Sequence, residues 1–305
     1  MMKESEEFTH FCDDQKNKCF VLFSLKDKST RKLEVPYETD YLFDSAQIKN
    51  QIYFTGGGMH PTESKGEQFF QTVVRLTIHP DMDTSIEKLP NMNVSRANHT
   101  LVALNNNTLY AIGGCNTKAE IPACEEFTVD KKKWRDCAFL NEKKMWVSVC
   151  AVEGRYLYAF GGSTNLKPKE SNLIECLDTN DHAAKMWAKV ELTAGKELWP
   201  RCFFVGCVPL AGDTVLLFGG LVKQTEVDDT YVFNPKTKAM IKGPKLARSD
   251  AFYRTKPGIY ENELMIVGSS EGDMHIYNIA EKKWILRKKA MWNSEVGFSI
   301  KSDTY

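Results

Sequence analysis

Three arginines precede similar apolar stretches and could bind anionic groups. Arg96 stands before residues 97–104, Arg201 before residues 202–208 and Arg248 before residues 249–253. A guanidinium group offers a planar fork of N–H donors that fits a carboxylate or a phosphate in bidentate fashion. We therefore predict that these arginines contact acidic groups. Those groups belong either to a partner or, as the alternative, to neighbouring segments that the arginines hold in place.

Aromatic and amide side chains lie close to these arginines in the sequence and could complete a binding hot spot. The candidate partner-binding residues are Arg96, Asn98, Trp146, Trp199, Arg201, Arg248 and Tyr253. Long polar loops, at residues 58–68, 115–123, 163–172 and 221–228, are the best candidates for specificity, because loops on a rigid scaffold commonly carry binding.

Catalytic chemistry has little support in the residue pattern. No phosphate-binding G-x-x-x-x-G-K-[ST] loop, G-x-S-x-G elbow or H-E-x-x-H run is present. His99 is the one histidine within an expected inner strand. A zinc site made of His10, Cys12 and Cys19 would lack the two tight ligand pairs that structural sites use. We expect no catalytic residues, no metal and no cofactor.

The elements that must position these residues come from an internal repeat. The run TLYAIGG at residues 108–114 recurs at 51–57, 155–162 and 214–220. A further copy at 263–269, ELMIVGS, has serine in place of the second glycine. Alternating apolar residues favour a strand, and the glycines allow a turn with positive φ. The first glycines are spaced by 57, 48, 58 and 49 residues. The glycines of the motif are Gly56, Gly57, Gly113, Gly114, Gly161, Gly162, Gly219, Gly220 and Gly268.

An aromatic residue and a tryptophan follow the glycines at steady distances. Phe127 lies 13 residues after Gly114, and Trp134 lies 7 residues further on. Trp284 likewise follows Tyr277 by 7 residues, whereas an enlarged turn displaces Trp187. We expect these aromatic residues to pack between sheets. The order and the period of about 50 residues resemble the kelch repeat family, in which each repeat is one propeller blade.

The resemblance implies an all-β fold, a six-bladed kelch β-propeller that forms one domain over residues 1–305. One blade would be closed by pairing the N-terminal segment with the C-terminal one, which removes two free sheet edges. Repeat symmetry would place the three arginines around one mouth, where such family members often contact acidic or phosphorylated peptides. The expected blades are residues 8–35 with 296–301, 42–90, 96–140, 146–192, 201–244 and 248–291.

The net charge, the length of the apolar runs and the number of cysteines limit the classes of partner. Forty basic and forty acidic residues give a net charge of zero, so nothing draws the chain toward nucleic acid or an anionic membrane. No apolar run approaches the roughly 18 residues of a membrane span. The number of cysteines is nine, which is odd, and no C-x-x-C spacing occurs among them, so we expect a reducing, cytoplasmic compartment.

These observations favour a non-catalytic scaffold that binds a protein partner at one mouth, with an acidic segment as one suitable partner. A cytoskeletal or ciliary assembly is one setting. A substrate receptor of a ubiquitin ligase is an alternative, which the lack of room for a BTB-type adaptor domain makes less favoured. A small-molecule or sugar-acting kelch enzyme is the second alternative.

Overall fold

The computed structural model of the chain describes residues 8–12, 19–24, 30–34, 41–59, 68–79, 83–116, 119–164, 170–210, 213–252, 256–268 and 273–287. Within these ranges all regular structure is β-strand. The chain divides into two compact units, Val35–Val190 and a unit that joins Met1–Glu34 to Glu191–Tyr305. Each unit is described by itself.

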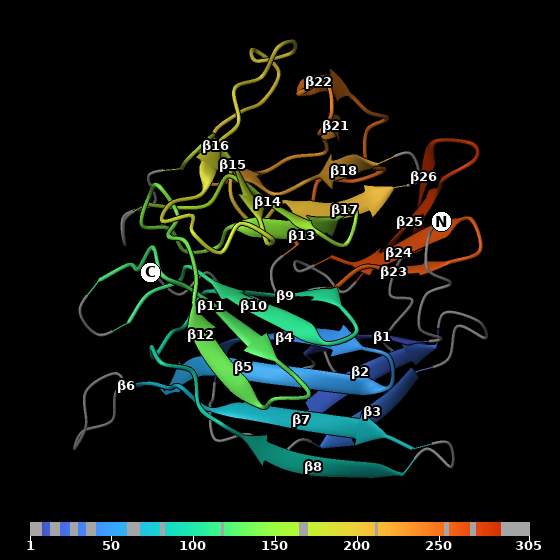
Figure 1. Cartoon of the computed structure of the whole chain (residues 1–305). Coiled ribbons are helices and arrows are strands. Elements are labelled where there is room, and N and C mark those ends of the chain that lie inside the picture. The colour runs from blue at the N-terminus through green and yellow to red at the C-terminus, as the bar shows by residue number, and fades with distance from the viewer. Residues whose placement is uncertain are drawn as a thin grey trace. The chain divides into compact units, whose positions relative to one another are not determined.

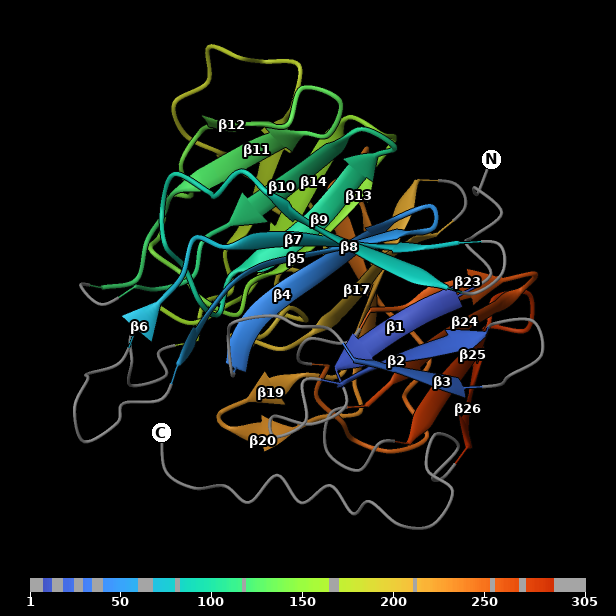
Figure 2. The same cartoon turned by 90° about the horizontal axis from the view of Figure 1, so that it is seen from below.

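Unit Val35–Val190 contains three antiparallel sheets, each built from consecutive strands (Figure 1). The first comprises β4 (Tyr41–Ile48), β5 (Gln51–Met59), β7 (Val73–Ile78) and β8 (Thr84–Leu89), with β6 (Gln68–Phe69) paired to β5. The second comprises β9 (Thr100–Asn105), β10 (Thr108–Ile112), β11 (Cys124–Thr128) and β12 (Lys133–Asp136). The third comprises β13 (Ser148–Val152), β14 (Tyr156–Phe160), β15 (Ile174–Asp178) and β16 (Ala188–Lys189). Figure 2 shows β9 and β13 of neighbouring sheets side by side.

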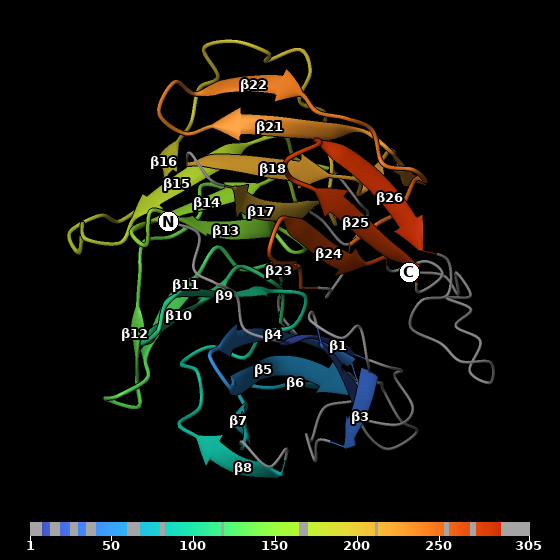
Figure 3. The ribbon, with the colours of Figure 1, turned by 90° about the vertical axis from the view of Figure 1, so that its right-hand side faces the viewer.

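The other unit holds two four-stranded sheets and one of three strands. The first is β17 (Gly206–Leu210), β18 (Thr214–Phe218), β21 (Thr230–Asn234) and β22 (Ala239–Lys242), which follow one another in Figure 3. A small ribbon, β19 (Leu221–Val222) with β20 (Thr225–Glu226), lies between β18 and β21 in the sequence. The second is β23 (Gly258–Tyr260), β24 (Glu263–Val267), β25 (Met274–Asn278) and β26 (Lys283–Arg287). The three-stranded sheet is β1 (Phe8–Cys12), β2 (Cys19–Ser24) and β3 (Thr30–Glu34).

Among the described residues the complete blades number five, where the sequence predicted six. The described residues form five sheets with a complete set of four blade strands, and the N-terminal segment forms only β1, β2 and β3. The fourth strand that the sequence assigned to that blade, residues 296–301, lies outside the described residues. The glycine motif occurs in five copies, so the repeat by itself identifies five blades. The sixth blade was predicted by combining the two ends of the chain.

The core of unit Val35–Val190 lies between its sheets, because the inner strands are apolar on both faces. Leu109 and Ala111 of β10 pack into a cluster with residues of β4, β5 and β7. Tyr110 and Ile112 point the other way and pack against residues of β13 and β14. Successive side chains of a strand alternate between the two faces, so a continuous apolar run such as TLYAI predicts a strand that is covered on both sides.

The glycine pair that follows β10 lies against the first residues of the following repeat and hydrogen-bonds to them. Gly113 has φ of 63° and Gly114 has φ of 95°, a region that disfavours residues with a Cβ. A Cβ on Gly114 would lie 2.5 Å from the Ala97 carbonyl oxygen. The Gly114 amide donates to the Lys144 carbonyl at 2.7 Å. Close approach of backbone to backbone therefore requires glycine at this position.

Short linkers cover the outer strands of two blades. Residues 193–194 run parallel to β22, where the Thr193 amide donates to the Lys238 carbonyl and the Met240 amide donates to the Ala194 carbonyl, both at 3.0 Å. Phe139 pairs in the same parallel manner with Met186, just before β16. Each linker leads into the blade whose edge it covers, which limits the exposed sheet edges.

Candidate functional site

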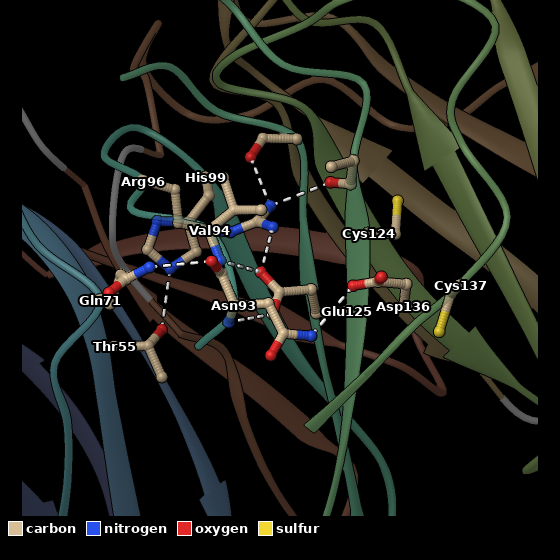
Figure 4. A network of polar contacts seen from close by, with 12 residues as sticks. Thr55, Gln71, Asn93, Val94, Arg96, His99, Cys124, Glu125, Asp136 and Cys137 are labelled. Atoms are coloured by element: carbon tan, nitrogen blue, oxygen red, sulfur yellow. Dashed lines mark hydrogen bonds and ion pairs between the residues drawn. The ribbon is translucent and has the colours of Figure 1, made fainter. Parts of the chain in front are cut away.

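Arg96 lies at the centre of a buried polar network (Figure 4). Its side chain is 0% exposed and donates to the carbonyl oxygens of Gly113 and Ala123 at 2.8 and 2.9 Å. The guanidinium also donates to Glu125 Oε1 at 2.6 Å. Glu125 in turn accepts from the amides of Asn93 and Val94, which belong to the linker before Arg96. The network fixes that linker against β11 and leaves Arg96 no surface for a partner.

Backbone hydrogen bonds show which residues occupy the same position as Arg96 in other repeats. The second glycine of one repeat donates to the carbonyl of this residue in the next, from Gly57 to Arg96, from Gly114 to Lys144 and from Gly220 to Asp250. In each of these repeats the residue at this position also forms a buried pair with a second side chain. Lys144 Nζ lies 2.6 Å from Glu175 Oε2, and Asp250 Oδ2 lies 3.0 Å from His275 Nε2, all with 0% side-chain exposure. In the third pair the acidic residue, Asp250, occupies the position that holds a basic residue in the other two.

The expectation that Arg96, Arg201 and Arg248 stand at matching places is wrong. The bridge between Phe203 and Leu221 matches that between Ala97 and Cys115, so Cys202 takes the place of Arg96 in its repeat. Arg201 lies one residue earlier and is exposed. Arg248 lies two residues before Asp250 and donates to Asp250 and Asp273 at 2.9 and 2.7 Å.

The other candidate residues fall into different environments. Asn98 and Trp146 both have positive φ, and the Trp146 amide donates to the Asn98 carbonyl at 2.9 Å. Asn98 is buried and Trp146 is half-buried. Trp199 is buried and packs edge-on against Tyr231, with ring centroids 5.6 Å apart. Tyr253 lies outside the described residues.

The motif aromatics pack in the interior. Trp134 lies against Phe127, with ring centroids 5.0 Å apart, and its Nε1 donates to the Pro90 carbonyl. Trp187 Nε1 donates to the Ala138 carbonyl at 3.0 Å. Trp284 contacts Tyr277 at 4.9 Å between centroids. All three indoles are buried, so their position supports packing of the sheets.

A pocket of about 350 Å³ opens between the end of β12 and the turn between β15 and β16, within unit Val35–Val190. Its apolar wall includes Leu177, Phe139 and Met186. Phe139 is 46% exposed and Met186 is 47% exposed, although both are large hydrophobic residues. Exposed apolar side chains that gather at a pocket typically mark a binding surface.

The polar side of the pocket is a connected group of side chains. Glu126 accepts from the Tyr110 hydroxyl at 2.6 Å and from Arg135 Nε at 3.0 Å. Arg135 Nη2 also lies 3.0 Å from His182 Nδ1, which must accept this bond because an arginine only donates. Burial and the nearby Glu126 carboxylate together raise the pKa of Tyr110, which keeps its hydroxyl protonated. The arrangement holds the turn at His182 against β12.

Sequence reasoning missed both the pairing position and the pocket. Arg96 and Lys144 each precede the first glycine of their repeat by 17 residues, whereas Arg201 and Arg248 precede theirs by 18 and 20. Asp250, which does take the Arg96 position, also precedes its glycine by 18 residues, so spacing alone would not have separated Arg201 from this set. Glu125 and His275 lie two residues before the aromatic residues Phe127 and Tyr277, and Glu175 lies two residues before Leu177. The pocket has no such signal, because two different repeats contribute to it.

Among the residues whose side chains the structure describes, no three His, Cys, Asp or Glu side chains are placed to hold a metal ion. The side chains of His10, Cys12 and Cys19 lie outside that set. The free thiols within that set are Cys115, Cys124, Cys137, Cys150, Cys176, Cys202 and Cys207. Burial is the largest cause that raises the pKa of Cys124 and of Cys137 to about 12. Neither thiol is therefore an activated nucleophile. No helix in the part of the chain that the structure covers has the length and apolar character of a membrane span.

Comparison with known proteins identifies the family. The KLHDC2/KLHL20/DRC7 Kelch-repeats domain matches residues 43–242 and 98–291. The chain therefore belongs to the kelch-repeat family, whose members fold as all-β propellers, generally bind proteins and are generally non-catalytic.

Individual relatives are distant. The F-box/kelch-repeat protein At2g22050 of Arabidopsis thaliana is 24% identical over 113 residues, which is 37% of this chain and 38% of that protein. The match therefore spans well under half the length of this relative. The solved structure of YjhT superposes with a TM-score of 0.70 over 94% of this chain and 99% of its own, at 13% identity. This likeness shows the fold alone.

Proposed function

We propose that this chain is a non-catalytic protein-interaction module that docks a partner at the pocket bordered by Phe139 and Met186. One observation carries the proposal. Of the exposed large hydrophobic residues in the described ranges, these two are backbone neighbours at one pocket. The remaining ones are scattered over separate strands: Met59, Ile86, Ile241 and Ile285.

The local construction supports a docking role. Trp187 anchors one side of the pocket to the Ala138 carbonyl, and the Phe139 amide donates to the Lys185 carbonyl at 2.9 Å. The apolar wall is therefore held by backbone pairing and does not depend on the exposed side chains. A preformed apolar surface on a rigid support reduces the ordering cost of binding.

Substitution of the apolar wall tests the proposal. We expect the double variant Phe139→Ser/Met186→Ser to lose the proteins that the wild-type chain captures from an extract of its native cells. Ile241→Ser is the matched control, because Ile241 is 59% exposed but lies on β22 away from any such neighbour. Equal capture by all three proteins, with unchanged melting temperatures, would exclude this pocket as the docking surface.

A second surface follows from the arginines. We propose that Arg201 and Arg248, which share a compact unit, offer an acidic segment the contact that buried Arg96 cannot. Arg201 is exposed, and the Arg248 side chain keeps 26% of its surface accessible. Trp146 lies in unit Val35–Val190, is half-buried and is the aromatic candidate for partner contact in that unit. Arg201→Glu should reduce capture of acidic partners and leave the melting temperature unchanged if this surface is used.

We further propose six blades, the sixth closed by residues 296–301 beside β1, β2 and β3. The grouping of residues 1–34 with 191–305 in one compact unit supports this closure. Removal of residues 296–305 should then expose an edge and cause association, which light scattering would detect. A truncated chain that stays monomeric and equally stable would exclude the closure.

We propose a cellular setting from the cysteines. The cysteines from Cys115 to Cys207 are free thiols, which supports a reducing compartment such as the cytoplasm. A cytoskeletal or ciliary scaffold is our first setting, and a substrate receptor of a ubiquitin ligase is the second. Identification of the proteins captured in the preceding experiment separates the two.

A further inference from the structure

The pocket carries more unpaired negative charge than positive charge. Two of its carboxylates are already neutralised, since Glu126 pairs with Arg135 and Asp178 pairs with Arg155. Asp136 and Asp181 have no cationic partner among the described residues. Within the described ranges Asp136 accepts from the side-chain Nδ2 of Asn93 at 3.0 Å, and Asp181 accepts from backbone amides of its own turn. Lys185 is the one lining cation without an ion pair among the described residues.

The raised pKa of a thiol at the pocket indicates the same excess of negative charge. Cys137 lines the pocket between Asp136 and Ala138. Burial is the first cause of its raised pKa, and the carboxylates of Glu126 and Asp136 raise it further, against the opposing effect of Arg135. The pocket therefore combines an apolar wall with a rim that favours a cation.

Resting on the proposed function, we infer that the partner segment carries a lysine or arginine beside an apolar side chain. The apolar side chain would pack on Phe139 and Met186, and the cation would lie near Asp136 and Asp181. This partner differs from the acidic segment that the arginines suggested, because the unpaired carboxylates of this pocket outnumber its unpaired cation. Lys185 lies on the apolar side and would disfavour a cation there, which gives the segment a preferred orientation.

The charge contribution should be modest and sensitive to salt. Exposed ion pairs contribute little individually, so loss of two should weaken binding by about two- to thirty-fold. The same pairs are screened when ionic strength rises, because the Debye length falls to about 8 Å at physiological salt. The apolar contact supplies the part of the affinity that salt does not remove.

Selection from a phage-displayed library of random 12-residue peptides on the full chain tests the inference. We expect enriched peptides with Lys or Arg within two residues of an apolar side chain, and no such enrichment on Met186→Ser. Synthetic copies should bind Asp136→Asn/Asp181→Asn about two- to thirty-fold more weakly. Both asparagines retain a carbonyl oxygen to accept the present hydrogen bonds, so folding should be preserved. Asp130→Asn, at the opposite end of β12, is the matched control and should bind like wild type.

The outcomes separate the two claims. Enriched peptides that depend on Met186 but are acidic, or bind the double asparagine variant as tightly as wild type, would overturn the charge inference and leave the docking proposal standing. Failure to enrich any peptide whose binding depends on Met186 would overturn both. Melting temperatures of all variants identify a loss of binding that comes from unfolding.

Discussion

Arg96 and Glu125 form a completely buried ion pair, with Nη2 2.6 Å from Oε1. The same position holds Lys144 with Glu175 in the next repeat and Asp250 with His275 in the last described one. Desolvation of two charges is costly, so such a pair is weak evidence of net stabilisation, but removal of one partner is strongly destabilising. The pair therefore constrains how the linker and the strand fit together.

Removal of one charge at this pair should be severe. We expect Glu125→Leu to lower the free energy of unfolding by about 3–5 kcal/mol, because Arg96 would keep a buried charge with only carbonyl partners. The double variant Arg96→Met/Glu125→Leu should recover most of the loss. Urea unfolding measures both values.

An exposed pair provides the control for that comparison. Lys236 and Asp213 lie 2.7 Å apart, and the lysine side chain is largely exposed. Lys236→Ala should change the free energy of unfolding by no more than about 1 kcal/mol. A loss for Glu125→Leu no larger than this would show that Arg96 is solvated in solution.

Two glycines with positive φ distinguish backbone strain from a steric clash. Gly154→Ala should cost about 1–2 kcal/mol, since its φ is 64° but a Cβ would meet nothing within 4 Å. Gly114→Ala should cost clearly more, because its Cβ would also lie 2.5 Å from the Ala97 carbonyl oxygen. Thermal unfolding of the two variants gives the comparison. Equal losses would mean that the close approach at Gly114 relaxes at no cost.

The sequence was informative where one residue type had one physical role. Gly113 and Gly114 marked the turn because their φ values exclude most other residues. The run TLYAI predicted a strand, which the structure buries on both faces. An asparagine such as Asn234 is likewise typical of a turn, since its side chain accepts from the Lys236 and Thr237 backbone amides. Such local requirements can be read without the fold.

The site could not be predicted in the same way. Position 96 and two of its equivalents hold arginine, lysine and aspartate, because a buried charge needs a compensating partner and not a fixed residue type. In another repeat the position holds Cys202. Arg201 was mistaken for a member of this set because the prediction followed residue type, and the spacing to the glycine varies by one residue between repeats. The pocket depends on the turn at His182 reaching Arg135 of another sheet, a contact that spacing along the chain does not report.

Alkaline pH should destabilise the protein through Cys124. Burial raises the pKa of this thiol to about 12, whereas in the unfolded chain it is about 8.5. The stabilisation from a raised pKa is complete below pH 8.5 and is lost as pH rises toward 12. Between pH 8 and pH 10 the loss should be about 2 kcal/mol.

Cys124→Ala isolates this contribution. The variant lacks the thiol, so its free energy of unfolding should fall less over the same pH range, while other titrating groups affect both proteins alike. Urea unfolding at both pH values measures the difference. Parallel pH dependence of variant and wild type would mean that Cys124 ionises as readily in the folded chain as in the unfolded one.

The linker at Thr193 should protect the edge of β22. Its amide donates to the Lys238 carbonyl, and its hydroxyl donates to the Thr237 carbonyl at 2.7 Å. Thr193→Pro removes the amide donor, so we expect a loss of about 1–2 kcal/mol together with association that increases with concentration, since β22 also exposes Ile241. Thr193→Ala keeps the amide and should lose stability without association. Sedimentation of the two variants distinguishes these results, and a monomeric Thr193→Pro protein would mean that the linker contributes stability but does not guard the edge.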